Sequence, residues 1–155
     1  MSGVVGPGSA DLDLEVKLAV YRHFASTGKR PTADQVTRDV SSDISSVMEA
    51  YVRLRAQRVL LLEPDGASIR MAPPFSGVPT QHIVEAGAVT YFANCAWDAL
   101  GIPAALGMPA TVRSRCEQSF EPLRLEVGLD GPGRSDWVFH CLVPAARWWE
   151  DLVFT

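Results

Sequence analysis

The stretch YFANCAWDALGIP, residues 91–103, decides how the second half of the chain folds, because a strand pattern and a helix pattern meet inside it. The apolar run AVTYFA before the cysteine favours an extended strand. The run CAWDALGIPAALG, residues 95–107, is typical of a helix until its proline and last glycine interrupt the pattern. We therefore expect a strand that passes directly into a helix.

Two residues at this junction carry chemistry. Asn94 is a candidate N-cap, so Cys95 is expected in the first helical turn, where free amides and the helix dipole favour a thiolate. Asp98 follows three residues later, on the same helical face. One interpretation is a buried thiol beside an acid that stabilises the helix start. The other is a nucleophile with its own proton carrier, since a nearby carboxylate helps only if proton transfer is part of the task.

Around this junction the second half is rich in β patterns. A Pro/Gly/Ser-rich segment, residues 72–80, marks a boundary before it. PAARWWEDL, residues 144–152, predicts a short helix with Pro144 in its first turn. Trp148 and Trp149 there are expected either to pack at a junction or to form a partner surface. The remaining strand predictions are ATVRSRC at 110–116, PLRLEVG at 122–128, WVFHCLV at 137–143 and VFT at 153–155.

The first half predicts three helices and a hairpin. Their expected ranges are 12–27, 32–40 and 44–59, followed by two β runs around the turn PDG in 59–72. Thr32 with Gln35 has the spacing of a capping box. In the first helix the apolar face is expected to carry Leu14, Leu18 and Tyr21, with contributions from Val20 and Phe24.

The fold class that follows is α+β. We expect a winged-helix-like three-helix lobe, residues 12–72, packed on a mostly antiparallel β-sheet lobe with short helices, residues 73–155. Residues 1–11 read as a flexible N-terminus without a signal-peptide pattern. A winged-helix shape often binds DNA, but Asp43 and Glu49 offset the arginines of the third helix, so nucleic acid is not expected as a partner.

Composition narrows the class of protein. The 155 residues are 47% hydrophobic and 21% charged, with a net charge of −4, which is ordinary for a globular protein. No apolar run is long enough for a membrane helix, so we expect no membrane partner and a cytoplasmic location. The three cysteines are widely spaced and form no CxxC pair, which argues against a disulfide framework or a structural zinc site. His23, His82 and His140 stand alone.

Taken together, MAPPFSGVPTQHIV, YFANCAWDALGIPAALG and ATVRSRC resemble the organomercurial (alkylmercury) lyase family, and the resemblance extends over residues 12–155. It implies cleavage of carbon–mercury bonds by protonolysis. Cys95 resembles the catalytic cysteine that captures mercury, and Asp98 the aspartate that carries the proton; both are expected to bind mercury as substrate or product. Cys116 resembles a third, structural cysteine. Mercury is a soft ion that prefers thiolate, and the apolar neighbours Tyr91, Phe92, Ala96 and Trp97 suit an organic group.

The resemblance also implies partners: an organomercurial substrate, cellular thiols and a mercuric reductase that accepts Hg(II). No resident cofactor is expected. The family pattern has a second catalytic cysteine just after a segment like WWEDLVFT, whereas this sequence ends at Thr155. The second lobe is therefore expected to be truncated at its C-terminus, or to lack that thiol. Cys141 lies too early to match and is interpreted as a core strand residue.

Three other functions remain open at this point. The first is a non-catalytic protein that binds mercury or another soft metal through Cys95. The second is a winged-helix regulator that responds to a metal. The third is a lyase-like fold adapted to other small-molecule chemistry.

Overall fold

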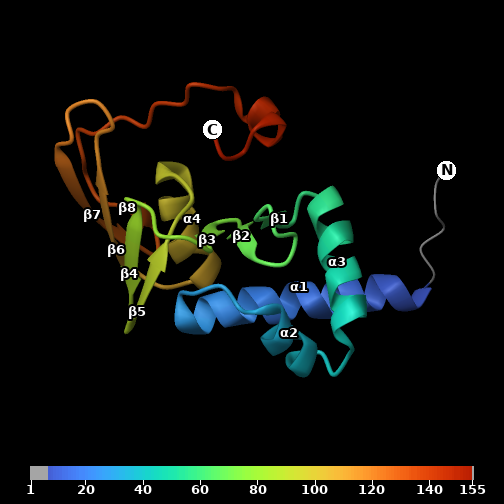
Figure 1. Ribbon diagram of the computed structural model, residues 1–155. Helices are drawn as coiled ribbons and strands as arrows, with labels where there is room; N and C mark the ends of the chain where they lie inside the picture. The colour runs from blue at the N-terminus through green and yellow to red at the C-terminus, as the bar shows by residue number, and fades with distance from the viewer. Residues whose placement is uncertain (1–6, 155) are drawn as a thin grey trace.

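Mixed helices and antiparallel sheets make up the computed structural model, which describes residues 7–154 (Figure 1). The helices are α1 (Pro7–Thr27), α2 (Ala33–Asp39), α3 (Ile44–Ala56), α4 (Ala96–Leu106) and the 3-10 helix η1 (Ala145–Glu150). The strands are β1 (Leu61–Leu62), β2 (Ile69–Ala72), β3 (Phe75–Ser76), β4 (Ile83–Ala86), β5 (Val89–Phe92), β6 (Ala110–Arg115), β7 (Pro122–Gly128) and β8 (Gly131–Pro132).

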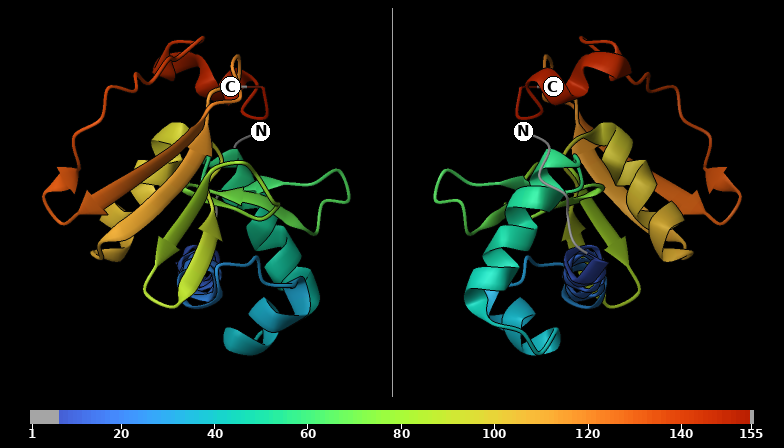
Figure 2. Two further views of the ribbon diagram at one scale, coloured as in Figure 1. Left: turned by 90° about the vertical axis from the view of Figure 1, so that its left-hand side faces the viewer. Right: turned by 90° about the vertical axis from the view of Figure 1, so that its right-hand side faces the viewer.

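The strands form two sheets. β1, β2 and β3 make a small antiparallel sheet in that order. The larger sheet has the order β5-β4-β6-β7-β8, again with antiparallel neighbours. Figure 2 shows α4 against one face of this larger sheet and α1 below its β4–β5 end. The α+β class and the strands expected at 110–116 and 122–128 are thus confirmed.

α2 and α3 begin directly after residues that cap them. Thr32 accepts a hydrogen bond from the backbone of Gln35, whose side chain accepts one from the Thr32 backbone, which completes the expected capping box. Asp43 caps α3 in the same way through the Ser46 amide, at 2.9 Å. The three helices and the following hairpin therefore appear in the expected order. A winged-helix classification of this part stays a prediction.

The buried face of α1 differs from the prediction. Val20 and Phe24 are buried as expected and so is Val16, whereas Leu14 and Leu18 are 55% and 39% exposed. Both sets have helical spacing, so periodicity alone does not choose between them. The choice is made by the elements that cover the helix, since α3 and β5 pack against it.

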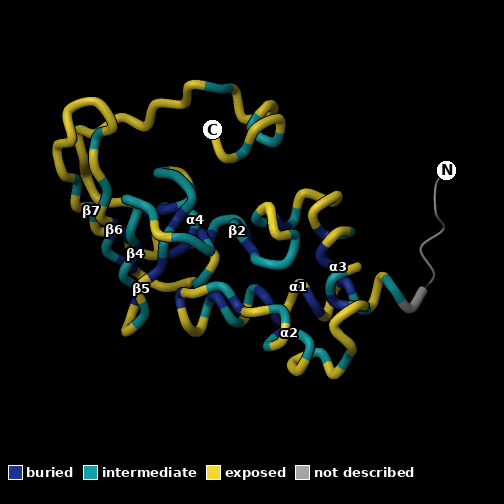
Figure 3. The backbone as a smooth tube through the Cα atoms, viewed as in Figure 1, coloured by how far each residue is buried: buried dark blue, intermediate teal, exposed yellow. Residues whose placement is uncertain are grey.

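The two halves share one continuous core. Phe75 of β3 lies at its centre, with its ring stacked on Phe24 of α1 at 5.5 Å and tilted against Tyr91 of β5 at 5.6 Å. The backbone of Phe75 also bridges Ala93, which links the small sheet to the large one. Figure 3 shows this buried zone running from α1 through β2 to α4. The junction between β5 and α4 is therefore supported from both halves.

Two predictions about the ends of the chain are wrong. α1 begins at Pro7, so residues 7–11 are helical and not a flexible lead-in; residues 1–6 lie outside the described part. Residues 137–143 form no strand, and residues 153–154 lie in a turn. The large sheet ends at β8, and the segment after it arches away from the sheet (Figure 1). Without a neighbouring strand, its β propensity has no hydrogen-bonding partner.

Among the helices within residues 7–154, none combines the length and the apolar character that crossing a membrane requires.

Candidate active site

The candidate site lies at the junction where β5 turns into α4. Cys95 is the N-cap residue of α4, with an extended backbone (φ −150°, ψ 179°), and its Sγ accepts a hydrogen bond from the Asp98 amide at 3.5 Å. This corrects the expectation that Asn94 would be the cap. A cysteine sulfur can take the place of a serine or aspartate oxygen here, because the cap needs only an acceptor for a free amide.

Burial decides the electrostatics of Cys95. The thiol is half-buried, and this burial raises its pKa above the ordinary value. The amide hydrogen bond from Asp98 acts in the opposite direction, while the negative charges of Asp98 and Cys141 raise the pKa further. From the sequence, the start of the helix is expected to stabilise the Cys95 thiolate. In the structure that stabilisation is outweighed by desolvation.

Asp98 is also half-buried, and burial raises the pKa of its carboxyl. The Asn94 side-chain amide donates to Asp98 Oδ2 at 2.9 Å and works against that rise. The same amide nitrogen donates to the Phe75 carbonyl at 3.3 Å. A carboxyl that keeps its proton to higher pH is suited to act as an acid. The structure thus brings the two predicted site residues into one helical turn.

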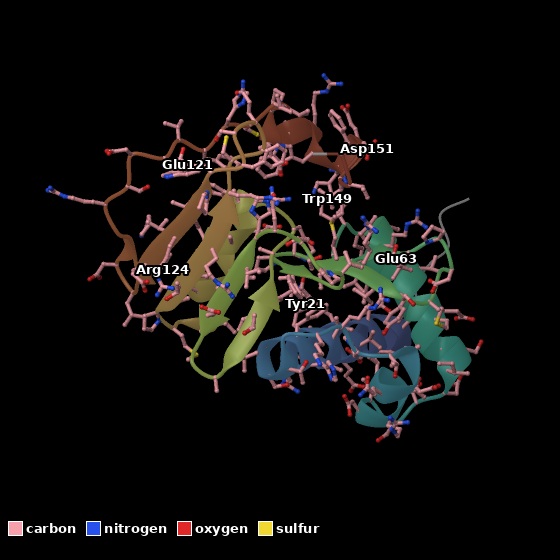
Figure 4. The ribbon with its side chains drawn as sticks, turned by 60° about the vertical axis from the view of Figure 1, so that its left-hand side comes forward. Tyr21, Glu63, Glu121, Arg124, Trp149 and Asp151 are labelled. Atoms are coloured by element: carbon pink, nitrogen blue, oxygen red, sulfur yellow. The ribbon has the colours of Figure 1, made fainter. Side chains whose placement is uncertain are left out.

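Tyr21 of α1 is a neighbour of the site that sequence reasoning placed only in the core. Its hydroxyl donates to the Pro73 carbonyl at 3.1 Å, and its pKa is raised to about 12 by burial and by the negative charge of Asp98. Figure 4 shows Tyr21 where α1 meets the large sheet. No local pattern relates residue 21 to residue 98, so only folding could reveal this proximity.

The aromatic neighbours divide into two groups. Tyr91 is buried and its hydroxyl donates to the Ala25 carbonyl at 2.6 Å, so it belongs to the core. Trp97 is 55% exposed and its ring lies 6.0 Å from that of Phe139 in the C-terminal segment. Phe92 and Ala96 are half-buried. Trp97 and Phe139 therefore bring the C-terminal segment next to the start of α4.

The other two cysteines lie outside this turn. Cys116 follows β6 directly, and hydrogen bonds from Ser119 lower its pKa. Cys141 was interpreted as a core strand residue, which is wrong: it is exposed, lies outside any strand, and its thiol donates to the Val143 carbonyl at 2.9 Å. Segment 137–143 has no sheet to join, so most of its side chains are exposed, although the Phe139 ring lies near that of Trp97.

The histidines and paired tryptophans contribute no ligand cluster. His82 Nδ1 lies 2.8 Å from Ser114 Oγ, and burial lowers its pKa. The Trp148 indole donates to the Val143 carbonyl at 2.8 Å, and Trp149 is half-buried on η1 (Figure 4). Within residues 7–154, no group of three or more His, Cys, Asp and Glu side chains is placed to hold a metal ion.

Comparisons with known proteins show which fold and which family this chain shares. Among solved structures, the chain is similar to the mercury-bound form of MerB2, with a TM-score of 0.62 and 21% identity. That likeness covers 83% of this chain and 66% of the other, so this chain spans just under two thirds of the length of MerB2. A search of curated proteins finds no match. A scan against protein families matches residues 75–155, slightly more than half of the chain, to MerB, alkylmercury lyase. The chain belongs to the alkylmercury lyase family.

Proposed function

We propose that this protein captures organomercurial compounds through Cys95 and cleaves their carbon–mercury bond by protonolysis, with Asp98 as the proton carrier. The products are a hydrocarbon and Hg(II). One observation carries the proposal: in a member of the alkylmercury lyase family, Cys95 Sγ lies 3.5 Å from the amide of Asp98 within one helical turn. Mercury is the substrate metal here, and thiolate is its preferred ligand.

Capture begins with loss of the Cys95 proton. Burial raises the pKa of this thiol, so a nearby base is needed to remove the proton at neutral pH. The Asp98 carboxylate takes it, and the Cys95 thiolate forms a bond to mercury while the original thiolate or anion leaves as a free ligand. Asp98 then holds the proton, which its raised pKa favours.

Cleavage returns that proton to carbon. A second thiolate, from an external thiol of the cell, binds mercury and increases its electron density. The electron pair of the carbon–mercury bond then takes the proton from the Asp98 carboxyl, so that a hydrocarbon leaves and the carboxylate is restored. Hg(II) remains between two thiolates, and further external thiol transfers it onward to an acceptor such as a mercuric reductase. Reduced thiols are plentiful in the cytoplasm, where we place the protein.

The surroundings suit an organic group. Trp97 lies two residues after Cys95, the proposed mercury ligand. Its side chain is exposed, and its ring lies 6.0 Å from that of Phe139. Aromatic side chains gain free energy when an apolar alkyl or aryl group covers them.

The test is hydrocarbon release. The purified protein is incubated with phenylmercury acetate and excess thiol, and benzene is measured by gas chromatography. We expect Cys95→Ser to abolish release and Asp98→Asn to slow it by about 100-fold or more, the usual effect of losing a general acid. Cys116→Ser is the matched control, since Cys116 lies outside the site and should be dispensable.

The same assay separates the alternative of a soft-metal binding protein. Stoichiometric retention of mercury without benzene, lost in Cys95→Ser, would replace the lyase proposal with a binding function. Benzene release at the wild-type rate in Cys95→Ser would contradict both.

A DNA-binding regulator has less support. Arg53, on the helix expected to read DNA, forms a bidentate pair with Asp13, with Nη2 2.8 Å from Oδ1, and lies 3.8 Å from Glu49. The positive charge of Arg53 is therefore paired with carboxylates of the protein itself. A mobility shift of DNA at low salt, where phosphate contacts are strongest, would revive this alternative.

A further inference from the structure

Asn94, the single asparagine of the chain, connects three parts of the molecule. It stands between β5 and Cys95, and its side-chain amide nitrogen donates to two acceptors. One is the Phe75 carbonyl of β3 at 3.3 Å, and the other is Asp98 Oδ2 in α4 at 2.9 Å. The amide thus ties the carboxylate of the site to the backbone of the small N-terminal sheet.

The orientation of this amide is determined by its partners. A carbonyl oxygen and a carboxylate oxygen can only accept hydrogen bonds, so the NH2 group must face both. Phe75 is itself held by stacking on Phe24 and Tyr91 and by pairing of β3 with β2. The Phe75 carbonyl therefore holds the Asn94 amide in place. That amide in turn presents its N–H donor to Asp98 from a fixed position.

Stability does not explain an amide at this position. Asn94 Oδ1 is buried and has no hydrogen-bond partner among the described residues. An unpaired buried acceptor destabilises the folded state, and a leucine of similar shape would avoid that penalty. The polar side chain is therefore better explained by what it does for Asp98.

The other groups that face Asp98 do not hold its carboxylate. The Tyr21 hydroxyl donates to the carbonyls of Pro73 and Val59 instead. Cys95 Sγ accepts from the backbone amide of Asp98 and, among the described residues, makes no hydrogen bond with the Asp98 side chain. Among residues 7–154, the hydrogen bond that orients this carboxylate comes from Asn94.

We propose that Asn94 is the positioning residue of the site: it holds Asp98 by Oδ2 and leaves Oδ1 to carry the proton between Cys95 and the substrate carbon. The proposal rests on the protonolysis proposed above. It also gives the small sheet a role in the reaction, because Phe75 of β3 holds the amide that holds the acid. Misplacing a reacting group by about 1 Å can slow a reaction 100-fold.

The kinetic test uses Asn94→Leu, which keeps the shape and removes the donor. We expect kcat for benzene release to fall about 10- to 100-fold, while the amount of mercury that Cys95 binds at equilibrium stays unchanged. The free energy of unfolding should stay the same or rise. Thr80→Val is the matched control: it removes a hydrogen bond to the Ala93 carbonyl, one residue from Asn94, without touching Asp98, and kcat should not change.

An unchanged kcat in Asn94→Leu would overturn the proposal, and so would a fall in kcat that only follows a loss of folded protein. The second readout does not depend on turnover. Labelling with 15N-asparagine gives a single side-chain NH2 pair in the spectrum. We expect one of its two proton resonances to shift on Asp98→Ala, and to shift less on Asp98→Asn, which keeps a neutral acceptor. The exposed Asp130→Ala is the control and should leave the pair in place.

The two readouts distinguish the failure of each proposal. If the wild-type protein releases no benzene but the NH2 pair responds to Asp98, the lyase proposal fails and the positioning of the carboxylate stands. If the pair does not respond to Asp98, the positioning proposal fails whatever the turnover.

Discussion

At the scale of single residues, burial controls the reactive groups more than helix position does. Cys95 and Asp98 both have raised pKa values because their half-buried sites disfavour charge. The negative charge of Asp98 also disfavours the Cys95 thiolate, so the two groups resist being ionised together. This suits a site whose task is to move one proton.

The thiols should therefore differ in reactivity. Hydrogen bonds from Ser119 lower the pKa of Cys116, whereas burial and the charge of Asp98 raise that of Cys95. At pH 7.5 we expect iodoacetamide to modify Cys116 before Cys95, measured by mass spectrometry of peptides over time. The Cys95 rate should rise as the pH increases beyond the ordinary thiol range.

Asp98→Asn is the control for this order. Removing the negative charge lowers the pKa of Cys95, so its alkylation should become faster while that of Cys116 stays unchanged. A Cys95 that reacts first in the wild-type protein would contradict the role of burial.

At the scale of elements, short helices depend on their caps. α2 has only seven residues, and a helix this short is marginal without tertiary support. The Thr32 capping box supplies two hydrogen bonds at its start. α4 begins on a cysteine cap and ends at Gly107, whose φ of +62° is the left-handed conformation that favours glycine.

Thr32→Ala should lower the free energy of unfolding by about 1 kcal/mol, because it leaves the Gln35 amide without its acceptor. Urea denaturation followed by circular dichroism measures this. Thr37→Ala is the matched control within the same helix: its hydroxyl only donates back to the Ala33 carbonyl, so its loss should change stability little. Equal losses in the two variants would mean that the box contributes nothing.

At the scale of the whole molecule, the end of α1 is in close contact with strand β5. Gly28 ends α1 with φ +70°, and a Cβ atom there would lie 2.0 Å from the Thr90 carbonyl oxygen. Tyr91, the next residue, donates to the Ala25 carbonyl at 2.6 Å. This contact joins the two halves beside the ring cluster of Phe24, Phe75 and Tyr91.

Gly28→Ala should therefore lower the free energy of unfolding by more than the strain of a left-handed alanine alone. Gly66→Ala is the matched control, since Gly66 has φ +68° but open space around its Cβ position. We expect Gly66→Ala to lower the free energy of unfolding by about 1 kcal/mol. Gly28→Ala should lower it by about 2 kcal/mol more, because the Thr90 backbone must move to make room for the new Cβ atom. Denaturant unfolding measures both, and equal costs would show that the close contact is not rigid.

Sequence patterns predicted the elements whose causes are local. The capping box at Thr32, the hairpin of β1 and β2, and the strands β6 and β7 follow from turn residues, caps and alternation within a few residues. The nearness of Cys95 and Asp98 was predictable for the same reason, because one helical turn brings residues i and i+3 together.

Only the tertiary structure decided the rest. It selected Val16 over Leu14 and Leu18 for the buried face of α1, since burial depends on which elements cover a helix. It left segment 137–143 without a strand, because a strand needs a neighbour. It also placed Phe75, Asn94 and Asp98 in one hydrogen-bonded chain. Local spacing put the thiol and the acid together, whereas desolvation and long-range hydrogen bonds, which exist only in the folded chain, determine how they are charged and held.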